Sequence, residues 1–254
     1  MQVPWFGFFP SARFLALILA AVPAALAQPA PESGSFAIAQ HGHAVGTASF
    51  QFTATKEGYD STSLVKVTMP GFDYALSKTE QLSPANQLVH VQLSATVNGE
   101  AVSVIAAPDA AQLLLSISAS GRSSTTRLAA HPGAVFMADF DPGALETLLA
   151  LAVEQNSRGL WAILPKNAGS IQPVQLATYP DQQGTLDGKP IVVHHLVATI
   201  AGASTDLFSG PENQLLQAEL PQQGFALVRR GFALKPPTKP VVPPGSLDAA
   251  PSGI

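Results

Sequence analysis

The sequence predicts a mainly β fold in which a long, curled antiparallel sheet forms a half-barrel around one hydrophobic helix near residues 142–155. Three observations lead to this prediction. Apolar and polar residues alternate along most of the chain, Asn-Gly and Asp-Gly pairs separate alternating segments, and one segment has apolar residues at helical spacing over most of its circumference. We expect about ten to twelve strands in antiparallel succession.

Residues 1–27 have the pattern of a secretory signal peptide. Arg13 is their only charged residue, an apolar run extends from Phe14 to Val22, and small residues precede an expected cut after Ala27. The apolar run is shorter than the about 20 residues that a membrane span needs. We therefore expect cleavage near Ala27, a periplasmic or secreted location, and no transmembrane span in the mature chain.

Alternation is clearest between Val89 and Val97, where every second residue is apolar and the residues between them are polar. The Asn98-Gly99 pair that follows is typical of a type I′ hairpin turn, because both central residues of that turn need positive φ. Asp187-Gly188 has the same role before a strand that extends to Ile200. Apolar residues fall on both faces of this later strand, so we expect both faces to be covered.

One helix is expected after Asp141, whose side-chain oxygen can accept hydrogen bonds from free backbone N–H groups at a helix start. Pro142 suits the first helical position because that position needs no N–H donor. Four apolar residues then recur at helical spacing: Leu145, Leu148, Leu149 and Ala152. A helix that is apolar over most of its circumference is normally enclosed by other structure. We expect the sheet to wrap around it, and we take these four residues as candidate contacts for a bound ligand.

Composition narrows the range of functions. The chain has no cysteine, 12% charged residues and a formal net charge of −4, with a pI near 5.8. The lack of cysteine excludes a disulfide framework, a thiolate metal site and a cysteine nucleophile, and the acidic balance argues against a nucleic-acid partner. Residues 236–254 are rich in proline, which predicts a disordered tail. Residues 28–235 are expected to form a single β-rich domain.

Histidines form two candidate clusters. His41 and His43 flank a glycine, and two imidazoles around a flexible turn can chelate a transition metal if a third ligand comes from elsewhere. The alternative is a solvated hairpin turn. His194 and His195 are adjacent in a predicted strand, so their side chains should point to opposite faces and cannot hold one ion together. A pH-sensitive role for this pair stays open beside the interpretation of two ordinary strand histidines.

Two further residue pairs are candidates for chemistry. Asp139 and Asp141 would share a face of an extended segment and could hold a cation or share a proton, although helix capping already explains Asp141. Ser63 and Lys66 have the Ser-x-x-Lys spacing of penicillin-interacting enzymes. The residues around them favour a strand, which would place the two side chains on opposite faces.

Several motifs of enzymes and cofactor sites do not occur in the sequence. We find no Gly-x-Ser-x-Gly elbow, His-Glu-x-x-His zinc motif, phosphate-binding loop or dinucleotide fingerprint, so no cofactor is expected. Arg229 and Arg230 lie in the last predicted strand, where alternation sends their side chains to opposite faces. We interpret this strand as a solvated edge strand that resists mispairing, and the alternative is that one guanidinium group meets an anionic head group or a carboxylate.

Two segments resemble a known family. Phe36–Phe50 has the pattern of a strand, a glycine turn and a Val-Gly-Thr step, and residues 206–216 and 219–229 have the pattern of a terminal hairpin. They are similar to the hairpins of an exported bacterial domain of unknown function, whose members are thought to share the half-barrel of lipoprotein carriers such as LolA and LppX. The resemblance covers most of residues 34–232, with Phe208 where that family usually has Trp. It implies a concave apolar surface suited to acyl chains, with Phe208 as a further candidate ligand contact and no catalytic residues.

These observations favour a non-enzymatic exported protein that binds a lipid-like or other hydrophobic molecule, or an envelope protein. Fold does not determine function, so an alternative stays open. The alternative is a periplasmic hydrolase with dispersed Ser, His and Asp residues, which a motif search does not detect.

Overall fold

The computed structural model describes residues 33–166 and 168–236 of the chain. The predicted signal sequence, residues 1–27, and residues 237–254 of the predicted tail lie outside the described residues. Within the described ranges, no helix has the length and apolar character that a membrane crossing requires.

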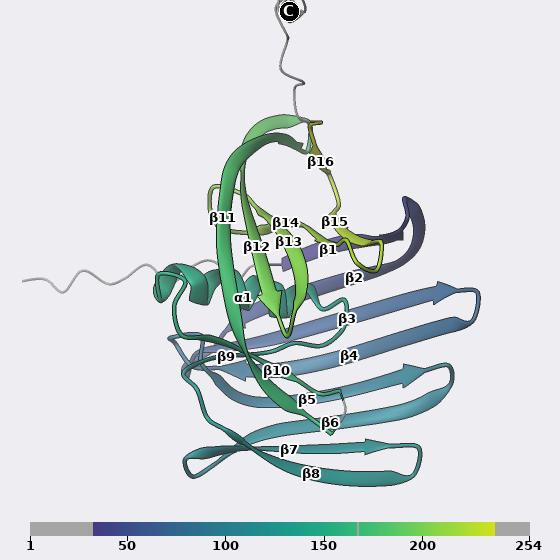
Figure 1. The fold of residues 1–254 in the computed structure, drawn as a ribbon, viewed down its shortest axis with the longest axis vertical. Coiled ribbons are helices and arrows are strands. Elements are labelled where there is room, and N and C mark those ends of the chain that lie inside the picture. Colours follow the sequence, from purple (N-terminus) through teal and green to yellow (C-terminus); the bar gives the residue numbers. More distant parts are fainter. Residues whose placement is uncertain (1–32, 167, 237–254) are drawn as a thin grey trace, which may run out of the picture. The chain divides into compact units, whose positions relative to one another are not determined.

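The described residues form one long, open sheet and one helix, as the sequence predicts (Figure 1). The helix is α1 (Pro142–Glu154). The strands are β1 (Ser33–Gln40), β2 (His43–Ala54), β3 (Tyr59–Met69), β4 (Phe72–Leu82), β5 (Leu88–Val97), β6 (Glu100–Asp109), β7 (Gln112–Ala119), β8 (Arg122–Ala129), β9 (Gly133–Phe136), β10 (Leu160–Leu164), β11 (Ser170–Leu186), β12 (Lys189–Ile200), β13 (Ala203–Ser209), β14 (Leu215–Leu220), β15 (Phe225–Arg229) and β16 (Phe232–Leu234).

The sheet has two parts that meet at β1. Strands β1 to β8 form an antiparallel meander, and β15, β14, β13, β12 and β11 continue beyond β1 before β10 and β9 end the sheet. Strand β16 pairs with β11 outside this path. All pairings in the described sheet are antiparallel except β9 with β10, which is parallel. Parallel neighbours need a crossover connection, and α1 supplies it because the helix lies between β9 and β10 in the chain.

The 16 strands exceed the number that we predicted, because several hairpins turn at residues without an Asn-Gly or Asp-Gly signal. Asn98 and Asp187 have φ values of 51° and 49°, as their predicted turns require. Ala110, Ser120 and Ala201 have φ values of 53°, 47° and 51°, a region that residues with a Cβ seldom adopt. Each of these three residues lies in a turn between two paired antiparallel strands.

The prediction of a solvated edge strand at Arg229 and Arg230 is wrong. Strand β15 pairs with β1 on one side and β14 on the other, so it lies inside the sheet. The guanidinium group of Arg229 donates hydrogen bonds to the carbonyl oxygens of Ser33 at 2.6 Å and Leu215 at 3.0 Å. Alternation could not show this pairing, because β1 and β15 lie at opposite ends of the described chain.

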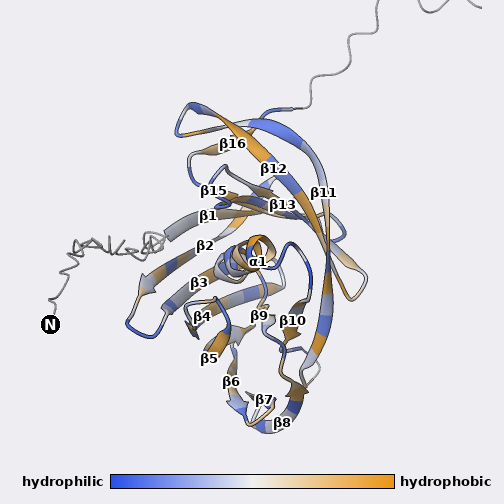
Figure 2. Cartoon of the chain, turned by 90° about the vertical axis from the view of Figure 1, so that its left-hand side faces the viewer, coloured by the Kyte–Doolittle hydropathy of each residue, from blue (hydrophilic) through white to orange (hydrophobic). Residues whose placement is uncertain are grey.

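Helix α1 begins and is enclosed as predicted. The Asp141 carboxylate accepts hydrogen bonds from the N–H groups of Gly143 at 3.0 Å and Ala144 at 3.3 Å, and Pro142 follows it as the first helical residue. The helix contacts β2, β3, β9, β10 and β14, and Figure 2 shows it end-on between the two parts of the sheet. We call the face of β1–β8 that packs toward α1 the inner face, and the opposite one the outer face.

Candidate functional site

A cleft of about 730 Å³ lies between the two parts of the sheet, beside the N-terminal end of α1. We call it the inner cleft. One side is formed by inner-face residues of β5, β6 and β7, such as Ala95, Val102 and Ile117, and another by Ile200 and Ala203 around the β12–β13 turn. The volume lies within the range of about 300–1,000 Å³ that is typical of small-molecule sites. The lining is mainly apolar, so the cleft suits a hydrophobic molecule.

Most polar groups in the inner cleft come from β4 and from the segments beside α1 and β10, and Thr205 of β13 adds a hydroxyl group. Tyr74, Asp139, Asp141 and Lys166 all line it, and Lys166 Nζ lies 2.8 Å from Asp139 Oδ1 in an exposed ion pair. Burial, followed by the charges of Asp139 and Asp141, raises the pKa of Tyr74 well above its ordinary value. The phenol therefore keeps its proton and can donate a hydrogen bond to a ligand.

Lys78 is a charged residue of β4 on the buried inner face. Its side chain is 0% exposed, and Nζ lies 2.6 Å from Asp141 Oδ2 and 2.8 Å from Glu80 Oε2. Burial by itself would lower the pKa of Lys78, but the attraction of Asp141 and Glu80 outweighs burial and raises it, so the ammonium group stays charged. The ion pair with Asp141 ties the N-terminal end of α1 to β4.

Two serines complete this buried cluster. Ser63 lies opposite Lys78 and Ser61 lies opposite Glu80 in the β3–β4 ladder. Ser63 is buried and Lys66 is exposed, so the two residues of the Ser-x-x-Lys pattern do point to opposite faces. The Ser63 hydroxyl has no hydrogen-bond partner among the described residues, and at 1% exposure it has no access to a substrate.

Glu80 makes the stability of the fold depend on pH. Burial raises the pKa of Glu80 above its ordinary value of 4.5, and Lys78 offsets only part of this effect. When the pH rises above 4.5, Glu80 loses its proton in the unfolded chain before it does so in the folded chain. The contribution of Glu80 to the free energy of unfolding therefore falls as pH rises. We expect Glu80→Gln to become more stable relative to wild type as pH rises above about 4.5, by at most about 1.4 kcal/mol per pH unit.

Thermal unfolding followed by circular dichroism at several pH values measures this difference. Glu100→Gln is the control, because Glu100 is exposed and its replacement should leave the pH dependence unchanged. A stability difference between Glu80→Gln and wild type that is the same at every pH would contradict the assignment.

His194 and His195 occupy adjacent positions in β12, and each meets a carboxylate. His194 Nδ1 lies 2.9 Å from Asp181 Oδ1, and His195 Nε2 lies 2.8 Å from Asp206 Oδ1. The other ring nitrogen of His195 lies 3.3 Å from Gln182 Nε2. Both nitrogens of His195 thus have partners that are not serine hydroxyls, so this histidine belongs to no Ser-His-Asp triad among the described residues.

His41 and His43 lie at the β1–β2 turn and are both exposed. His41 takes the turn position with a φ of 48°. In residues 33–166 and 168–236, no group of three or more His, Cys, Asp or Glu side chains is placed to hold a metal ion. The two histidines therefore have no third ligand of these types within the described ranges.

The five predicted ligand contacts lie in three different places in the structure. Leu145 lines the inner cleft. Leu148, Leu149 and Ala152 belong to the main hydrophobic core and do not line the cleft. Phe208 lies in a smaller second core, where its ring stacks on the His195 ring at 4.6 Å between centroids. The cleft residues from β5–β7 and the β12–β13 turn were not among the predictions.

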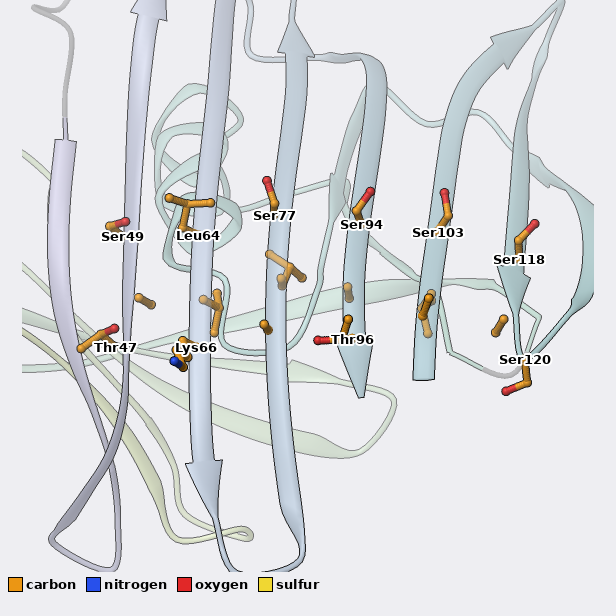
Figure 3. A pocket seen from close by; sticks show the side chains of 18 of the residues that line it. Thr47, Ser49, Leu64, Lys66, Ser77, Ser94, Thr96, Ser103, Ser118 and Ser120 are labelled. Atoms are coloured by element: carbon orange, nitrogen blue, oxygen red, sulfur yellow. The ribbon is translucent and has the colours of Figure 1, made fainter. Parts of the chain in front are cut away.

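A second concavity, of about 1050 Å³, lies on the outer face of β1–β8 (Figure 3). We call it the outer groove. Ser77, Ser94, Ser103 and Ser118 are direct neighbours across the β4–β5, β5–β6 and β6–β7 ladders, and Leu64 takes the corresponding place on β3. The groove thus carries a row of hydroxyl groups that runs across the strands.

Comparisons with protein-family models, curated proteins and solved structures give no match for this chain. Function must therefore be argued from the geometry of the inner cleft and the outer groove.

Proposed function

We propose that the protein is a non-enzymatic exported binding protein that holds a lipid-like hydrophobic molecule in the inner cleft. The observation that carries this proposal is the cleft itself, which is mainly apolar and has a volume of about 730 Å³. Transfer of apolar ligand surface from water into such a site contributes about 25 cal/mol per Å². An acyl chain or a molecule of similar character supplies that surface.

The polar groups of the cleft would orient such a ligand. Tyr74 offers a phenol proton. The Lys166 side chain is 66% exposed, and among the described residues its ammonium group pairs only with Asp139. An anionic head group could accept a hydrogen bond from Tyr74 and draw the ammonium group away from Asp139. The proposed ligand is therefore an apolar chain that ends in a carboxylate or phosphate.

Features of the sequence support the same proposal. The pattern of residues 1–27 supports export to the periplasm. The resemblance of the hairpins to an exported family with a lipoprotein-carrier-like half-barrel supports an acyl ligand. An envelope protein that delivers or receives the ligand would be the partner.

Filling the cleft tests the proposal. Ala95 faces the inner cleft, and its neighbour Thr96 is exposed on the outer face of the same strand. We expect Ala95→Trp to weaken binding of the fluorescent fatty acid cis-parinaric acid by roughly tenfold or more, because the indole occupies ligand volume. Fluorescence titration measures the affinity.

Thr96→Trp is the matched control, since it adds the same side chain outside the cleft. Equal binding by wild type and Ala95→Trp would exclude the inner cleft as the site. No binding of the fatty acid by wild type, together with a native mass spectrum that shows no copurified apolar molecule, would remove the proposal.

A periplasmic hydrolase is the second candidate function. It would act through the His195–Asp206 pair, 2.8 Å apart, and would need a nucleophile other than a serine in contact with His195. This alternative requires that the protein hydrolyse a p-nitrophenyl ester and that His195→Ala abolish turnover without unfolding the protein. No turnover by wild type, or unchanged turnover in His195→Ala, would remove the hydrolase.

A further inference from the structure

The outer groove differs from the inner cleft in the hydroxyl and cationic residues that line it. Ten of its lining residues are Ser or Thr, and its charged lining residues are the three cations Lys66, Arg122 and Arg230. One carboxylate borders it, since Glu100 Oε2 lies 3.4 Å from Ser120 Oγ. In a chain with a net charge of −4, a concavity whose charged lining residues are all cations favours an anionic ligand.

The hydroxyl row is open to a ligand. Ser77, Ser94 and Ser103 are exposed on the outer face, and within the described residues their hydroxyls form no hydrogen bond with another side chain. Neighbouring strands are about 4.8 Å apart, so the row offers one hydroxyl at each strand step. This repeat is close to the length of one sugar ring in an extended polysaccharide.

The three cations are spread along the direction of the row. Arg230 lies beside β1, because its N–H donates to the Ser35 carbonyl at 2.8 Å, Lys66 belongs to β3, and Arg122 begins β8. Seven strand steps separate β1 from β8, or about 33 Å along the sheet. A long, linear ligand that crosses the strands would meet all three, whereas a small anion would meet one.

We infer that the outer groove binds an acidic linear polysaccharide, whose hydroxyls exchange hydrogen bonds with the Ser and Thr row and whose carboxylates pair with Lys66, Arg122 and Arg230. Leu64, which is 58% exposed, offers an apolar contact to the C–H face of a sugar ring. A single-stranded nucleic acid fits less well, because Phe36 is the only aromatic residue lining the groove, and at 0% exposure it offers no stacking surface. The two sites share Ala95, Val102 and Ala119 in their linings, but none of the hydroxyl or charged residues of the outer groove lines the inner cleft.

Titration with a galacturonic acid octamer, which has one ring for each of the eight strands β1–β8, tests the inference. We expect binding that weakens as salt is added and that falls roughly tenfold or more in the triple variant Lys66→Gln, Arg122→Gln, Arg230→Gln. The double variant Ser94→Val, Ser103→Val should also weaken binding, although it changes no charge. Maltooctaose, which has hydroxyls but no carboxylates, should bind much more weakly than the acidic octamer.

A second triple variant provides the matched control. Lys56→Gln, Arg158→Gln, Lys189→Gln removes three exposed cations outside the groove and should keep the affinity of wild type. Absence of binding, equal losses in the two triple variants, or unchanged affinity in the Ser-to-Val variant would overturn the inference. Equal affinity for polyglutamate or oligothymidylate would overturn it too, because the groove would then be a general polyanion site. Circular dichroism confirms that each variant is folded.

Discussion

Replacing Lys78 by Met is expected to lower the free energy of unfolding by about 3–5 kcal/mol, because it leaves two buried carboxylates without their cation. Lys78 is 0% exposed on its side chain and lies within 2.8 Å of both Asp141 and Glu80. Asp141 also caps α1, so the loss reaches the helix as well as the sheet. Chemical denaturation followed by circular dichroism measures the change.

Two variants separate charge from packing at this position. Lys66→Met replaces an exposed lysine of the neighbouring strand and should change stability by less than about 0.5 kcal/mol. Lys78→Met combined with Glu80→Gln and Asp141→Asn removes all three charges and should recover much of the loss. A Lys78→Met protein as stable as wild type would show that the ion pairs do not hold the helix to the sheet.

Replacing Leu148 by Ala is expected to cost about 2–5 kcal/mol, because it opens a cavity in the middle of the core. Leu148 is 0% exposed, near the centre of α1. Thermal or chemical unfolding measures the loss. Since Leu148 does not line the inner cleft, the folded variant should still bind cis-parinaric acid with the affinity of wild type.

Val153→Ala is the control on the same helix, because Val153 is 57% exposed and its truncation leaves no cavity. Similar losses in the two variants would contradict an enclosed helix. Loss of fatty-acid binding in folded Leu148→Ala would show that the ligand reaches the main core, as the sequence predicts for the apolar residues of the helix.

Local features of the fold could be predicted well. The cap at Asp141, the hairpin turns at Asn98 and Asp187 and the opposite faces of Ser63 and Lys66 depend on residues close together in the chain. Each follows from backbone geometry or from the two-residue period of a strand. The turns at Ala110 and Ala201 could not be predicted in this way, because alanine does not favour positive φ by itself.

The buried cluster was missed although the sequence contains a signal for it. Lys78 and Glu80 are in phase with Tyr74 and Leu76, so alternation places two opposite charges on the apolar face of β4. Such a pair is buried only with partners. Its third member, Asp141, comes from a distant segment, and only the folded chain shows that it lies against Lys78.

The sequence by itself determined the class of structure, the one helix and the direction in which most strand side chains point, because these depend on local conformation and the periodicity of apolar residues. Only the tertiary structure decided that β15 pairs with β1, that β9 and β10 run parallel, and that β4–β7 face the β12–β13 turn across a cleft. These arrangements join residues far apart in the chain. Their stability comes from burial and hydrogen bonds that exist only after the whole sheet has formed.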